Sequence, residues 1–431
     1  MPAMSALARL TRLLQGRTAQ NLLALYGVQF ANYLLPLILL PFLARVLGPG
    51  GWGLLAIVQS YAQYLSLLVE YGFALSATRE VARHREHRDR LAEILAGVTG
   101  AKILLSVGAA GLTLLIAPWV ENLSQDPLLL WSGVFWAIAL GFSPNWFFQG
   151  LERLRLVAGI EVATKTIAAL FILLLVQSPS DAWKVLFLQG LASSLSSILT
   201  LWLAYKKVGF RWPNVPLSKE AFQLGWSMFF FRAAVSLYTV GNVFILGLFA
   251  PPHLVAYYAG AERLTKALLG LLEPINRTFF PKLSYLVQHS PQAAAHLAGR
   301  IVIAMGLGGA LGALLVVGLA PWIVHLLLGH EYQAATSIMR ILALLLPMIA
   351  LSNALGIQWM LALGLDRPFN GVILWAGFLN LGLALVLVPR LAHYGMAYAV
   401  VLVEAFVTGA MWFYLWRQGK TPWQIQKRIQ A

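Results

Sequence analysis

Residues 301–328 read IVIAMGLGGALGALLVVGLAPWIVHLLL, a run that contains no Lys, Arg, Asp or Glu. A helix needs about 20 consecutive apolar residues to cross the hydrocarbon core of a membrane. This run is longer than that. It therefore predicts a transmembrane helix, which we place at 297–328.

The composition of the whole chain agrees with this stretch. Of the 431 residues, 59% are hydrophobic and 11% are charged, whereas about 25% of the residues of a soluble domain are charged. So few charges cannot cover the surface of a soluble protein of this length, and we expect an integral membrane protein. The chain has no cysteine, which excludes disulfides, thiolate nucleophiles and Cys-based metal sites.

Continuous apolar runs recur along the chain and predict an all-α polytopic membrane protein. Strands of a membrane barrel would instead alternate apolar and polar residues over about 10 positions. The connections between the runs are short and leave no room for a soluble catalytic domain. The twelve predicted transmembrane helices are 21–46, 53–78, 91–117, 128–150, 154–177, 182–206, 220–249, 253–280, 297–328, 332–363, 368–389 and 394–416.

The basic residues predict the orientation of these helices. With the N-terminus inside, 21 of the 31 Lys and Arg fall in inner segments and 3 in outer segments. Lys and Arg collect on the cytoplasmic side of membrane proteins, so both termini are expected to be cytoplasmic. The net charge of +15 is then explained mainly by the basic residues on the cytoplasmic side, which also attract anionic lipids. Nucleic acid is not expected as a partner.

Two halves of six helices are predicted from a weak internal repeat. At an offset of 203 residues, Pro49 aligns with Pro252 and Pro144 with Pro347. Parallel repeats of this kind are typical of alternating-access transporters, so we expect two pseudo-symmetric six-helix bundles around a central cavity. The predicted parts are a basic N-terminus 1–18, an N-lobe 19–206, a linker 207–219, a C-lobe 220–416 and a basic tail 417–431.

Charged residues inside the predicted spans are the candidates for function, because each is costly in lipid and should face protein or water. Basic residues in the spans outnumber acidic ones, which favours an anionic substrate such as a phosphate or diphosphate. The predicted diphosphate-binding residues are Arg232, Arg263, Lys266, Lys102 and Arg277. The acids that are candidates for ion coupling or gating are Glu70, Glu161, Glu262, Glu273 and Glu404. Candidates for sugar contacts are Asn32, Asn145 and Trp146.

The alternative for several of these charges is pairing within one helix. Residues four positions apart lie on the same face of a helix, so Glu161 can pair with Lys165 and Glu262 with Lys266. Glu273 and Arg277 have the same spacing. Such pairs would hold the charges without any substrate, and the sequence leaves both interpretations open.

Signals for catalysis or cofactors are missing from the sequence. It has no GxxxxGK[ST] phosphate loop and no His-Glu metal-binding spacing, so we predict no catalytic residue, no metal and no cofactor. Two other function classes stay open as alternatives. One is a drug or cation antiporter, and the other is a membrane-embedded polysaccharide polymerase or lipid-sugar transferase.

Five segments carry a resemblance to a known family. The segment Tyr33–Gly53 ends Ala-Arg-Val-Leu-Gly-Pro-Gly-Gly-Trp-Gly, and Glu70-Tyr-Gly-Phe-Ala-Leu-Ser-Ala-Thr-Arg-Glu-Val-Ala-Arg83 follows it. The others are Pro144-Asn-Trp-Phe-Phe-Gln-Gly-Leu-Glu-Arg153, Tyr257-Tyr-Ala-Gly-Ala-Glu-Arg263 and Phe280-Pro-Lys-Leu-Ser284. In this order they resemble the Wzx-type lipid-linked oligosaccharide (O-antigen) flippases of the MOP exporter superfamily.

The resemblance implies a MATE/MOP-like fold of twelve helices in two bundles. It implies that undecaprenyl-diphosphate-linked repeat units cross the bacterial inner membrane from the cytoplasmic to the outer leaflet, with an ion gradient as a candidate energy source. The family's Arg-Glu motif falls on Arg79 and Glu80, and its basic positions in helix 8 fall nearest Arg263 and Lys266. Expected partners are the lipid-linked oligosaccharide, membrane lipids, and the polysaccharide polymerase and chain-length machinery, with the chain itself a monomer. Lipid II flippases of the superfamily have two further helices, which argues against a peptidoglycan precursor.

Overall fold

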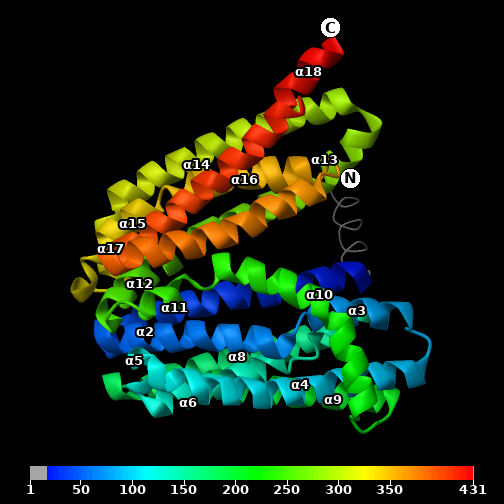
Figure 1. The fold of residues 1–431 in the computed structure, drawn as a ribbon, viewed down its shortest axis with the longest axis vertical. Coiled ribbons are helices and arrows are strands. Elements are labelled where there is room, and N and C mark those ends of the chain that lie inside the picture. The colour runs from blue at the N-terminus through cyan, green and yellow to red at the C-terminus, as the bar shows by residue number, and fades with distance from the viewer. Residues whose placement is uncertain (1–16, 431) are drawn as a thin grey trace, which may run out of the picture. The chain divides into compact units, whose positions relative to one another are not determined.

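The computed structural model describes the backbone of residues 17–430 and nearly all side chains of residues 35–427 (Figure 1). Within residues 17–430 the regular structure is entirely helical, which confirms the predicted all-α class. The side chains in 35–427 that lie outside this description are those of Ser227, Phe231, Ala234, Val235, Leu237, Tyr238, Thr239 and Arg277.

The chain divides into two compact units. Unit 1 consists of Met1–Phe42 and Val58–Ala233, and unit 2 consists of Leu43–Ile57 and Ala234–Ala431. Helix α2, Arg17–Glu70, contributes to both units. Helix α10, Val215–Thr239, lies in unit 1 as far as Ala233. The lobe boundaries expected from the sequence remain a prediction.

Unit 1 is a bundle in which helix α9 packs along both α6 and α8 (Figure 1). Its apolar core includes Phe73, Leu95 and Phe147, which come from three different helices. Besides α2 and α10, its helices are α3 Phe73–Arg83, α4 Arg88–Ile116, α5 Glu121–Ser124, α6 Pro127–Gly141, α7 Asn145–Gly150, α8 Leu154–Leu175 and α9 Ala182–Val208.

Unit 2 is built around the long helix α14, which packs on α16 and on the C-terminal helix α18 (Figure 1). A π-helical turn, Asn353–Met360, continues α16. The helices of this unit are α11 Asn242–Gly247, α12 Pro252–Leu269, α13 Glu273–His289, α14 Pro291–Leu327, α15 Ala335–Leu342, α16 Leu345–Ser352, α17 Asp366–Arg417 and α18 Pro422–Gln430.

Two of the long helices are broken where the sequence predicts an outer turn. Helix α2 has a non-helical backbone at Gly48, with φ of 63°, between the predicted spans 21–46 and 53–78. Helix α17 has one at Ala392, with φ of 47°, between 368–389 and 394–416. Each long helix therefore corresponds to two of the predicted spans.

Eight helical segments within the described residues are long and apolar enough to cross a membrane. Two of them, Leu35–Arg83 and Asp366–Lys427, contain the breaks described above. The predicted spans 220–249 and 253–280 are absent from the eight. They correspond to α10–α11 and α12–α13, which are interrupted and carry charges. The chain is a multi-pass membrane protein, and the total of twelve spans stays a prediction.

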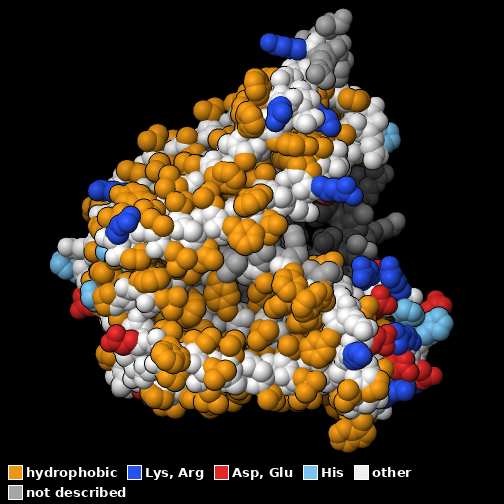
Figure 2. All heavy atoms as spheres, viewed as in Figure 1, with side chains coloured by type: hydrophobic (Ala, Val, Ile, Leu, Met, Phe, Trp, Pro, Cys, Tyr) orange, Lys and Arg blue, Asp and Glu red, His pale blue; other side chains and the backbone are white. Residues whose placement is uncertain are grey.

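The surface of the helices supports a lipid environment. Large apolar side chains such as Leu174 on α8 and Ile198 on α9 are well exposed, and Figure 2 shows how closely apolar side chains cover the visible face. Charged side chains of unit 1 gather where α3 turns into α4 (Figures 1 and 2). This turn lies in the basic segment that the sequence predicts to be cytoplasmic. The apolar surface of the other helices is larger than a soluble protein would expose to water.

The turn after the break in α2 packs very closely in unit 2. A Cβ atom added to Gly53 would overlap the backbone carbonyl of Pro252. Trp52 beside it is completely buried. The residues of the aligned outer turns, around Pro49 and Pro252, are thus packed together through a glycine that no larger residue can replace without movement.

Replacing Gly53 with Ala should destabilise unit 2 by about 1–3 kcal/mol, the usual cost of an extra group in a packed interior. Gly50→Ala is the matched control, because a Cβ atom there meets nothing within 4 Å. It should be neutral or slightly stabilising, since Ala favours a helix by about 1 kcal/mol over Gly. Thermal unfolding in detergent measures both, and equal midpoints for the two variants would contradict this packing.

Candidate functional site

Glu70 and Arg232 form an ion pair in unit 1. Arg232 Nη1 on α10 donates to Glu70 Oε1 on α2 at 2.5 Å, although the two residues are 162 positions apart. The side chains retain 35% and 25% of their exposure. In the sequence, Arg232 has no acidic residue within one helical turn. The sequence makes Arg232 a candidate for diphosphate binding and Glu70 a candidate for ion coupling or gating, and it does not pair them. The fold supplies the partner that the helix itself lacks.

Lys102 lies deeper in the same unit. Its side chain is 2% exposed, and its Nζ donates to the carbonyl oxygen of Ser143 at 3.2 Å. This carbonyl lies between α6 and α7, where the helix is interrupted before Pro144. A helix end leaves backbone carbonyls without intrahelical partners, so the ammonium group of Lys102 satisfies one of them. Glu70 also attracts Lys102 electrostatically.

Glu161 is the centre of a second polar group in unit 1. Lys165 Nζ lies 2.5 Å from Glu161 Oε1 on helix α8, which confirms the pairing expected from the i,i+4 spacing. Asn145 Nδ2 on α7 donates to the other carboxylate oxygen at 3.0 Å. The structure therefore uses Asn145, a candidate for sugar contact, to link two helices.

Trp146 has a different environment from its neighbour Asn145. Its side chain is 4% exposed and belongs to the apolar core of unit 1. Its ring meets that of Phe147 edge to face, with centroids 5.9 Å apart. This burial favours packing over contact with a sugar.

Helix α12 presents three charges in unit 2. Glu262 is buried, forms an ion pair with Lys266 Nζ at 3.1 Å and accepts a hydrogen bond from Tyr258 Oη at 3.3 Å. Arg263 places its guanidinium 4.4 Å from the centre of the Trp52 ring. A cation over an aromatic face is stabilised by about 0.5–2 kcal/mol. The predicted pair Glu262–Lys266 is confirmed, and Trp52 is a contact of Arg263 that the sequence did not indicate.

Two further acidic candidates lie on α17 and α13. Glu404 on α17 is 3% exposed and accepts a hydrogen bond from Ser352 Oγ on α16 at 2.7 Å. Glu273 is the first residue of α13 and follows a 3-10 turn, Gly270–Leu272, that interrupts the predicted helix 253–280. The side chains of Asn32 and Arg277 lie outside the described residues.

Buried amides form further links in unit 2. Gln358 Nε2 donates to Asn276 Oδ1 at 2.9 Å, and Asn380 Nδ2 donates to Asn242 Oδ1 at 2.9 Å. Gln358 and Asn380 were missed in the sequence. The sequence pattern that could have identified Gln358 and Asn380 is an amide side chain inside an otherwise apolar run. Such side chains often form hydrogen bonds between membrane helices.

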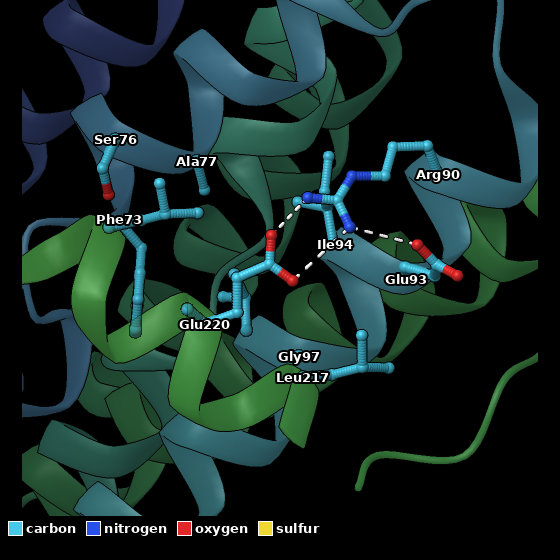
Figure 3. Close-up of a pocket in the computed structure, with 12 residues that line it drawn as sticks. Phe73, Ser76, Ala77, Arg90, Glu93, Ile94, Gly97, Leu217 and Glu220 are labelled. Atoms are coloured by element: carbon cyan, nitrogen blue, oxygen red, sulfur yellow. Dashed lines mark hydrogen bonds and ion pairs between the residues drawn. The ribbon is translucent and has the colours of Figure 1, made fainter. Parts of the chain in front are cut away.

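Figure 3 shows a small pocket in unit 1 where the start of α10 meets α3 and α4. The Arg90 guanidinium donates to both Glu220 and Glu93, and Arg211 pairs with Glu93 at 3.0 Å. Phe73 and Ile94 line the apolar side of this pocket (Figure 3). We call Arg90, Glu93, Arg211 and Glu220 the clamp of α10. The sequence did not reveal it, because Arg211 and Glu220 are more than 100 positions from their partners Glu93 and Arg90.

Comparison with known proteins gives matches over most of the chain. The model of the polysaccharide biosynthesis protein family matches residues 18–287. A protein named "Putative O-antigen transporter" from Escherichia coli K12 is 29% identical over 91% of this chain and 95% of its own length. Its namesake from Shigella dysenteriae is 30% identical over 90% of this chain and 97% of its own.

Solved structures of very different sequence share the fold. The lipid II flippase MurJ in an inward closed conformation has a TM-score of 0.65 at 12% identity, covering 91% of this chain and 87% of its own. An inward-facing multidrug resistance MATE transporter of the MOP superfamily has a TM-score of 0.63 at 15% identity, covering 94% and 99%. These likenesses confirm a MOP/MATE-like fold.

The clamp of α10 should contribute measurably to the stability of unit 1. Arg90→Ala and Glu220→Ala should each lower the unfolding temperature, and the double variant should lose less than the sum. Because the two side chains are 32% and 43% exposed, we expect a coupling of about 0.5–1 kcal/mol after screening.

The exposed pair Arg85 and Glu152 is the matched control for this double-mutant cycle. Its side chains are 41% and 68% exposed, so its coupling should be smaller. Thermal unfolding in detergent is the measurement. A larger coupling for Arg85–Glu152 than for Arg90–Glu220 would show that the clamp does not hold α10.

Proposed function

We propose that this chain, which belongs to the polysaccharide biosynthesis protein family, is a flippase for oligosaccharides linked to a polyprenyl diphosphate. The family membership agrees with the resemblance to Wzx-type flippases in the sequence, and the relatives are named O-antigen transporters. The transported unit would pass from the cytoplasmic to the outer leaflet of the bacterial inner membrane by alternating access.

The observation that carries this proposal is the presence of basic side chains within the predicted spans of both units. Lys102 and Arg232 lie in unit 1, and Arg263 and Lys266 lie in unit 2. A cation in a membrane helix is expensive and marks a functional path. Guanidinium and ammonium groups bind phosphate oxygens through charge-assisted hydrogen bonds, so these residues suit the diphosphate of the lipid carrier.

The other function classes have less support. A drug antiporter shares the fold, but fold alone does not determine substrate. The relatives that match nine-tenths of the chain are named for O-antigen transport.

An ion gradient, acting through an acid such as Glu70, Glu161 or Glu404, is our proposed energy source. Polymerase and chain-length proteins are proposed partners, and a monomer is the proposed state.

Flipping of a fluorescent polyprenyl-diphosphate trisaccharide in proteoliposomes tests the function directly. The wild-type protein should move the lipid across the bilayer. Arg232→Gln and Arg263→Gln should slow it roughly 10- to 100-fold, because a hydrogen bond to a charged group is worth about 1.5–3 kcal/mol. Arg85→Gln, in an exposed pair with Glu152, should flip the lipid normally.

Wild-type protein that reconstitutes in folded form and moves no lipid under any applied ion gradient would refute the flippase. Normal flipping by Arg232→Gln and Arg263→Gln would instead retain the flippase and remove these two arginines from the diphosphate site.

The proposed orientation is open to a separate test, because the chain contains no cysteine. Glu86→Cys and Glu121→Cys are matched single-cysteine variants at exposed positions, predicted inside and outside respectively. An impermeant maleimide added to intact cells should label the Glu121→Cys variant and leave the Glu86→Cys variant unlabelled until the cells are broken. The reverse pattern would overturn the cytoplasmic placement of both termini.

A further inference from the structure

We propose that the Glu70 carboxylate is a built-in competitor for the substrate phosphate on Arg232, so that binding of the lipid diphosphate displaces Glu70. This inference rests on the proposed function and adds a specific role for Glu70. The argument starts from the ion pair that joins α2 and α10 within unit 1.

The contact of Arg232 with Glu70 is of a kind that a phosphate can replace. Arg232 Nη1 meets Glu70 Oε1 at 2.5 Å. A guanidinium binds carboxylates and phosphates with the same fork of N–H donors. The carboxylate oxygen thus occupies a position that a phosphate oxygen would take.

The pair is also accessible. The Arg232 and Glu70 side chains retain 35% and 25% of their exposure, whereas a structural pair sealed in the bundle would be buried. Lys102 in the same unit is by contrast 2% exposed. The partial exposure of both side chains leaves room for an anion to approach the pair.

The local charge favours an anion with more than one negative charge. Two cations, Lys102 and Arg232, are attracted to one acid, Glu70. One carboxylate leaves an excess of one positive charge among the three groups. A diphosphate diester carries two negative charges, so a phosphate oxygen can take the Arg232 guanidinium while the displaced Glu70 carboxylate stays attracted to Lys102.

The pair therefore has two roles at different stages of transport. Without substrate, Glu70 keeps the guanidinium of Arg232 from being an unpaired charge in an apolar region, which would be costly. With substrate, the phosphate takes over this function. An arginine that is paired with a carboxylate of the protein binds its ligand less tightly than an arginine without such a partner. The weaker binding also assists release of the lipid at the outer side of the membrane.

Equilibrium binding of the fluorescent polyprenyl-diphosphate trisaccharide to detergent-solubilised protein tests this exchange. Glu70→Gln removes the competing carboxylate and should tighten the Kd about 3- to 10-fold, which corresponds to the free energy of a partly exposed ion pair. The same variant should flip the lipid more slowly, because release of the tightly bound lipid is hindered. Arg232→Gln should weaken the Kd at least tenfold. A purely structural pair predicts no gain in affinity from either variant.

Two further variants keep the test decisive. Glu152→Gln removes an exposed acid that pairs with Arg85 in the same unit and should leave the Kd unchanged. If Glu70→Gln does not fold, Glu70→Asp loosens the pair while keeping the charge and should tighten binding in the same direction, by less.

An unchanged or weaker Kd in the folded Glu70 variant would overturn the competitor role. If wild-type protein still flips the lipid in that case, the proposed function stands and only this inference fails. A wild-type protein that neither binds nor flips the lipid would remove both.

Discussion

A charge in hydrocarbon has no water to solvate it, and the arrangement of polar groups in this protein follows from that constraint. Each ionised side chain placed within an apolar helix must find a partner in the protein. Arg232 has Glu70, Lys102 has the carbonyl of Ser143, and Arg263 has the ring of Trp52. The three contacts differ in strength and in how exposed the side chains are.

The same constraint explains where the helices are interrupted. A break in a membrane helix exposes backbone carbonyls that lipid cannot satisfy. The interruption before Pro144 is tolerated because Lys102 donates to the carbonyl there. Asn145 just beyond the interruption links to Glu161 on α8. Lys102, which the sequence predicts to bind the diphosphate, therefore supports the backbone at this interruption.

The polar contacts in the two units have different character. In unit 1 the clamp of α10 and the Glu70–Arg232 pair connect helices by ion pairs that keep part of their exposure. In unit 2 the buried links include the neutral amides of Gln358 and Asn380 and the acid Glu404, which Ser352 contacts. Ion pairs that stay accessible can exchange partners, whereas buried amide links specify one packing arrangement.

The helical class, the breaks near Gly48 and Ala392, and the pairs Glu161–Lys165 and Glu262–Lys266 were all predictable from the sequence. Apolar runs, turn residues and a spacing of four residues are local properties of the sequence. The regular geometry of a helix then determines which of these nearby side chains lie on the same face. The pairing of Glu70 with Arg232 and the contact of Arg263 with Trp52 were not predictable. They join residues more than 160 positions apart, and only the packing of helices against one another determines which distant charges meet.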